Sequence, residues 1–143
     1  MFKITSEAIL AKMPMPPELQ GPFDRMIQLG ESMLDSKEMH SSIAETLEGK
    51  GSIGERIGTG IGQLIMIMWV KSNKTLPPKI MAPATVYLIA LAFDKIRRTG
   101  ANLPDSEVAV AIEQALPLVM HLFGITPENA DNIAQQFAQK VTA

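Results

Sequence analysis

The chain has 143 residues, with 13 lysines and arginines against 15 aspartates and glutamates, so its formal net charge is −2. This length is enough for one domain with its own hydrophobic core. The absence of cysteine excludes disulfides, thiolate metal ligands and cysteine nucleophiles. A slightly acidic chain has no general attraction to phosphate backbones, so we expect no sequence-specific binding to nucleic acids.

The N-terminal residues 1–21 are expected to form a proline-rich arm. Thr5 or Ser6 can cap a short helix that ends at Lys12. The residues after it must be extended, because each proline fixes its own φ and restricts the residue before it. The arm's only apolar run, 8–10, is flanked by charges, so we expect no signal peptide, which favours a cytoplasmic location over secretion by that route. The part of the arm predicted to dock onto a partner consists of Met13, Met15, Pro16 and Pro17.

The rest of the chain, 22–143, is expected to form a single helical domain. Apolar residues recur at helical spacing from Pro22, which predicts an amphipathic helix of about four turns. A capping-box pattern at Ser42 predicts a short helix before a loop at 48–51. Ser52 and Glu55 repeat that pattern and predict a helix over about 53–71.

The predicted helix 53–71 contains two neighbouring rows of residues at i, i+4 spacing, one of glycine and one of large apolar side chains. Each glycine costs about 1 kcal/mol relative to alanine inside a helix, so we expect close packing by another helix to offset three of them. The helix over 80–93 is favoured as this neighbour, and a second subunit is the alternative. The predicted packing interface consists of Gly54, Gly58, Gly62, Ile57, Ile61, Ile65 and Trp69.

The segments 57–70 and 80–93 carry no charge and belong to a predicted central hairpin, 53–98. Both are shorter than the roughly 20 residues that a membrane-spanning helix needs. Basic residues flank both ends of the hairpin, so no positive-inside asymmetry orients it. A buried hairpin is therefore favoured over a membrane hairpin. Lys95, Arg97 and Arg98 before Gly100 are typical of a helix end, where cations interact favourably with the macrodipole.

Two more amphipathic helices are predicted, one from Asn102 or Asp105 to about Phe123 and one after Thr126. No segment shows the two-residue period of a strand. The fold class expected is therefore all-α: a compact bundle of about five helices with a proline-rich N-terminal arm.

No residue pattern points to catalysis. The stretch 49–54 matches the letters of a GxGxxG motif, but a predicted helix precedes it, whereas dinucleotide binding requires a strand there. The two histidines are far apart and have no partner at metal-ligand spacing. We therefore expect no enzyme, no cofactor and no metal site.

The segments 54–70 and 82–98 resemble the small helical virion proteins of tailed bacteriophages, which line the connector or are packaged for ejection with the genome. This resemblance implies assembly in many copies, and some ejection proteins also meet membranes. We expect a non-enzymatic structural or assembly protein that binds itself or other proteins of a larger complex. The alternatives are a membrane-active helical hairpin and a small adaptor with a methionine-lined peptide groove, since the chain has 10 methionines.

Overall fold

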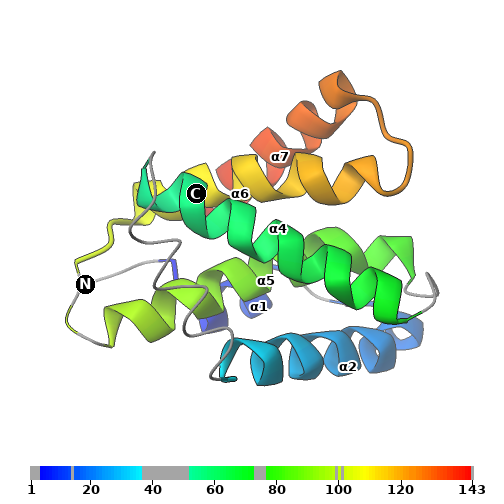
Figure 1. Cartoon of the computed structure of the whole chain (residues 1–143), viewed down its shortest axis with the longest axis horizontal. Helices are drawn as coiled ribbons and strands as arrows, with labels where there is room; N and C mark the ends of the chain where they lie inside the picture. Colours follow the sequence, from blue (N-terminus) through cyan, green and yellow to red (C-terminus); the bar gives the residue numbers. More distant parts are fainter. Residues whose placement is uncertain are drawn as a thin grey trace.

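The computed structural model describes residues 4–13, 15–36, 52–72, 77–98, 100 and 102–142, which contain helices and no strand. The all-α class is therefore confirmed for these residues, with six helices where about five were predicted. The short helix predicted after Ser42 lies outside the described residues. The helices of Figure 1 are α1 (Ser6–Lys12), α2 (Pro17–Leu34), α4 (Ile53–Lys71), α5 (Pro78–Arg97), α6 (Asp105–His121) and α7 (Pro127–Thr142).

Side-chain caps begin three of the helices where the sequence predicts them, and before α7 the Thr126 hydroxyl accepts a hydrogen bond from the Asn129 N–H at 3.4 Å. The Ser52 hydroxyl accepts a hydrogen bond from the Glu55 N–H at 3.2 Å, and α4 then continues to Lys71 as expected. The Thr5 hydroxyl accepts from the Ala8 N–H at 3.2 Å and begins α1. Local sequence is sufficient to predict these starts, because both partners of each bond lie within one turn.

The start of α2 differs from the prediction. The helix begins at Pro17 rather than at Pro22, and the Leu19 N–H donates to the Pro16 carbonyl at 2.9 Å in its first turn. Pro17 is suited to the first helical position, where its missing N–H would have no intrahelical partner. Pro22 is tolerated inside the helix because Gly21 has no Cβ to meet the proline ring. Helix α2 therefore crosses the boundary that separates the predicted arm from the domain.

Helix α5 is the centre of the fold and packs against α1, α2, α4 and α6. Its uncharged residues are buried along most of its length, as expected for a helix that is apolar on all sides. The buried Thr85 hydroxyl donates to the Met81 carbonyl at 2.6 Å, so this polar group is satisfied within the helix. Helix α6 packs between α4 and α7, and α7 forms an outer layer at the top of Figure 1.

The N-terminal segment 4–13 is part of the folded body. Ile4, Ile9 and Met13 are buried in the main hydrophobic core. Helix α1 packs on α5 and touches α7, and the Lys12 ammonium donates to the Val141 carbonyl at 3.0 Å. The segment is thus held at both ends of α1 by residues from the second half of the chain.

Candidate interaction surface

The glycine row of α4 faces α6, and the two backbones approach closely. An ideal Cβ added to Gly58 would lie 2.6 Å from the Ala111 carbonyl oxygen, and one on Gly62 would lie 2.9 Å from Leu118 Cδ1. A Cβ on Gly54 would meet the Glu107 carbonyl oxygen. The close neighbour is therefore α6, and the prediction that favoured the 80–93 helix is wrong. Helix α6 presents its own backbone and the small Ala111 to the row, so only glycine fits opposite.

The contacts also show that α4 and α6 run parallel (Figure 1), because successive glycines meet successive turns of α6. At the C-terminal end of this contact, the rings of Trp69 and Phe123 meet edge to face with centroids 4.9 Å apart. At its N-terminal end, the Gly54 N–H donates to the Glu107 carboxylate at 2.7 Å. A carboxylate at a helix N-terminus is stabilised by the macrodipole. Residues 49–51 of the GxGxxG stretch lie outside the described residues.

The isoleucine row next to the glycines is directed into the core. Ile57, Ile61 and Ile65 are buried, and Trp69 is half-buried against the same core. All seven residues predicted as a packing interface are thus in contact with other parts of their own chain. Any surface that α4 offers to a partner must lie on a different face.

The opposite face of α4 carries exposed apolar side chains near its C-terminal end. Met66, Ile67 and Val70 have exposed fractions of 42%, 43% and 64%. Leu118 of α6 is 38% exposed. It lies against Gly62, which is one helical turn before Met66 in α4. We call Met66, Ile67, Val70 and Leu118 the outer patch. Its members come from neighbouring turns of two packed helices, so they form one surface.

A groove lies beside the outer patch, between α2 and α4. These helices are antiparallel in Figure 1, and both pack on α5 while barely touching one another. The resulting groove has a volume of about 380 Å³. We call it the α2–α4 groove, and its lining residues are Pro22, Arg25, Met26, Leu29, Met68, Lys71, Ser72 and Pro77.

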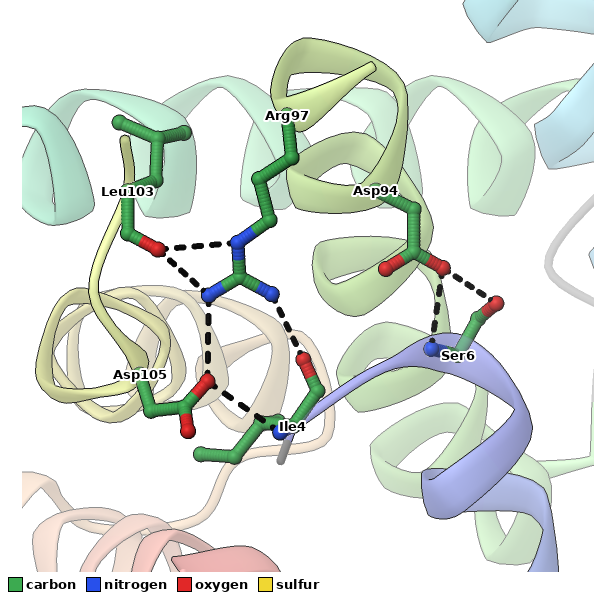
Figure 2. A network of polar contacts seen from close by, with 6 residues as sticks. All are labelled: Ile4, Ser6, Asp94, Arg97, Leu103 and Asp105. Carbon is green, nitrogen blue, oxygen red and sulfur yellow. Dashed lines mark hydrogen bonds and ion pairs between the residues drawn. The ribbon is translucent and has the colours of Figure 1, made fainter. Parts of the chain in front are cut away.

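A polar network binds the N-terminal segment to the corner between α5 and α6 (Figure 2). The Arg97 guanidinium donates to the Leu103 carbonyl at 2.9 and 2.7 Å, to the Ile4 carbonyl at 2.8 Å and to the Asp105 carboxylate at 3.2 Å. The same Asp105 oxygen accepts from the Ile4 N–H at 3.2 Å. The Arg97 side chain is only 5% exposed, so this guanidinium is a structural link between three segments.

A second carboxylate extends this link to the start of α1. Asp94 accepts hydrogen bonds from the Ser6 N–H at 3.1 Å and from the Ser6 hydroxyl at 2.6 Å (Figure 2). The Arg97 guanidinium also lies 5.5 Å from the centre of the Phe93 ring, a distance that permits a cation–π interaction. Sequence reasoning assigned Arg97 to a helix end and missed this role, because backbone carbonyls as partners leave no pattern in a sequence.

Tyr87 is the one titratable group in the described ranges whose pKa departs clearly from its usual value. Burial raises the pKa of its hydroxyl, and the negative charges of Glu31, Asp94 and Glu7 raise it further. A hydrogen bond with Ser6 acts in the opposite direction. The phenol therefore keeps its proton beyond the pH at which a free tyrosine loses it.

The predicted docking residues of the arm have different environments. Met13 is buried in the core and Met15 is half-buried against it, whereas Pro16 and Pro17 are exposed. The two methionines therefore bind their own chain, and Met13 is not available to a partner in this fold.

Two other kinds of site are absent from the described residues. They contain no group of three or more histidine, cysteine, aspartate or glutamate side chains placed to hold a metal ion. None of the helices described is both long and apolar enough to cross a bilayer. Comparison of the chain with protein-family models, curated proteins and solved structures finds no match.

Proposed function

We propose that this protein is a non-enzymatic assembly protein that binds a second copy of itself through the outer patch. The observation that supports this proposal is the exposure of Met66, Ile67 and Val70 on a helix whose other large apolar side chains are buried or half-buried. Exposed apolar side chains that gather on one surface are typical of a protein–protein contact, because association removes them from water. The glycine row has a structural role in this proposal, because its close contact with α6 positions α4.

The charge of this surface favours a contact between identical copies. Thr59 and Gln63 precede Met66 on the same face of α4 and carry no charge, whereas the exposed Glu55 and Lys71 flank the patch at its two ends. In a two-fold symmetric contact the same surface meets itself, so a charge close to the symmetry axis would face its own copy, whereas a charge away from the axis can face a different residue. An uncharged apolar patch has no such penalty. Self-association of this kind is compatible with assembly in many copies, as in the virion that the sequence resemblance implies.

The proposal is tested by the molar mass of the purified protein as a function of its concentration. We expect light scattering after size exclusion to show a concentration-dependent mass above that of the monomer. Val70→Asp should weaken this association by about tenfold or more, since it would bury an unpaired carboxylate. Gln136→Asp adds the same charge at an exposed position of α7 and should leave association unchanged. Both variants should retain the wild-type melting temperature, because neither residue is buried.

Two outcomes would contradict the proposal. One is a wild-type protein that remains monomeric at every accessible concentration. The other is association that Val70→Asp and Gln136→Asp affect equally. The membrane alternative gives a distinct result, namely a monomer in buffer that floats with liposomes through the same patch.

A further inference from the structure

The α2–α4 groove has the chemistry of a site for a peptide of another protein. Its floor is formed by Met26 and Met68, both buried. Leu29 is exposed at its edge, and Pro22 and Pro77 lie at the end where α2 begins and α4 ends. Methionine is flexible and polarizable, so such a floor can adapt its shape to inserted apolar side chains. The volume of about 380 Å³ is within the range of ordinary ligand sites.

The edge of the groove is basic. Arg25 of α2 and Lys71 of α4 line it from opposite sides, and both are exposed. Neither forms an ion pair with a residue in the described ranges. Lys79, two residues after Pro77, is also exposed near this end. The groove therefore combines an apolar floor with cations that have no carboxylate partner in the part of the chain that the structure describes.

We propose that the α2–α4 groove binds an acidic amphipathic helix of a different protein. A third helix can lie in the valley between two helices, with its apolar residues at i, i+3 and i+4 inserted against the methionines. Carboxylates on the flank of that helix would then face Arg25 and Lys71. Such pairs at a partly exposed edge contribute mainly to specificity and to the rate of association.

A second copy of this chain is a less suitable occupant of the groove. Symmetric docking of groove against groove would bring Arg25 and Lys71 of one copy near the same cations of the other. This like-charge contact at an apolar interface would oppose association. The groove and the outer patch are therefore proposed to bind different partners, although α4 contributes residues to both.

The test uses the full chain and two synthetic amphipathic helical peptides with the same leucine face. The first peptide has glutamate on its polar flank, and the second has lysine at the same positions. Fluorescence anisotropy of the labelled peptides measures their affinities. We expect the acidic peptide to bind at least about tenfold more tightly than the basic one, and we expect this preference to diminish as salt is added.

Charge reversal then locates the site. The double variant Arg25→Glu/Lys71→Glu should weaken the acidic peptide by about tenfold and strengthen the basic one. The control Arg98→Glu/Lys140→Glu makes the same change of net charge at exposed positions away from the groove and should leave both affinities near their wild-type values. Leu29→Asp should weaken both peptides, because it places a charge at the apolar edge.

Several results would overturn the inference. They are no binding of the acidic peptide, equal affinity for the two peptides, and equal effects of the groove and control variants. Binding to anionic vesicles with no binding of the acidic peptide would assign the basic edge to a lipid surface instead. Met66→Asp provides an independent check, since a charge at this position of the outer patch should weaken self-association while leaving the affinity for the acidic peptide within about twofold.

Discussion

Gly58 lies directly against the backbone of α6, so that a Cβ on this residue would fall 2.6 Å from the Ala111 carbonyl oxygen. The same Cβ would lie 2.8 Å from the Cβ of Gln114. Gly60, two residues later in α4, has nothing within 4 Å of the equivalent position. The packing of α6 therefore requires glycine at position 58, whereas no contact in the described part of the structure requires glycine at position 60.

Alanine at these two positions should have opposite effects on stability. Gly58→Ala should lower the free energy of unfolding by about 1–3 kcal/mol, because the backbone of α6 must move to admit the methyl group. Gly60→Ala should raise it by about 0.5–1 kcal/mol through helix propensity alone. Urea unfolding followed by circular dichroism measures both. Equal effects of the two substitutions would mean that close packing at Gly58 is unimportant.

This pair shows how far local sequence reasoning extends. The spacing of Gly54, Gly58 and Gly62 predicts a close contact, and the cap at Ser52 predicts where the helix begins. The choice of neighbour depends on how α4, α5 and α6 stack in three dimensions. That choice is a property of the whole chain, because both candidate helices have apolar faces and only one can lie over the row.

Removal of the Arg97 guanidinium should detach the N-terminal segment. Arg97→Met leaves the Ile4 and Leu103 carbonyls without their donor, so we expect a loss of about 2–3 kcal/mol in the free energy of unfolding. Hydrogen exchange at the Ile4 amide should accelerate at the same time. The exposed neighbour Arg98 is the control, and Arg98→Gln should change stability by less than about 0.5 kcal/mol. Unchanged exchange at Ile4 in Arg97→Met would refute the role assigned to the guanidinium.

Tyr87 is the only tyrosine, so the ultraviolet absorbance of tyrosinate reports its ionisation directly. We expect the pKa of this hydroxyl to lie above 10.0 in the folded protein and to fall to its ordinary value in denaturant. Because the folded-state pKa is the higher one, its stabilising contribution is complete below the unfolded pKa and is lost as pH rises through the folded value. Tyr87→Phe should remove this part of the alkaline destabilisation. Identical titration curves in native and denatured protein would contradict the prediction.

Trp69 is the only tryptophan and can report on the end of the α4–α6 contact. Phe123→Ala removes its aromatic neighbour and admits water, so the fluorescence emission of Trp69 should move to longer wavelength. Phe137→Ala on α7 removes a ring of the same kind that also packs on the core, and it should leave the emission maximum unchanged. A shift of equal size in both variants would instead indicate a general loosening of the core.

The two proposed binding surfaces and the Arg97 network were not predictable in the same way as the helices. The burial of Ile4 and Met13 leaves no helical pattern in the sequence, because both residues lie just outside α1. The α2–α4 groove arises only because α2 and α4 rest on α5 at a distance from one another. The exposure of Met66 and Val70 likewise depends on which faces of α4 its neighbours cover.

The link between Ile4 and Arg97 joins residues separated by 93 positions, and the bond from Ile4 to Asp105 spans 101. During synthesis on the ribosome, the segment 4–13 emerges before the residues it binds and must therefore wait for them before it can dock. Contacts of such long range form late in folding, because much of the chain must be ordered to close the loop. The segment 4–13 is thus secured late, and until then its apolar residues are exposed to other nascent chains and to chaperones.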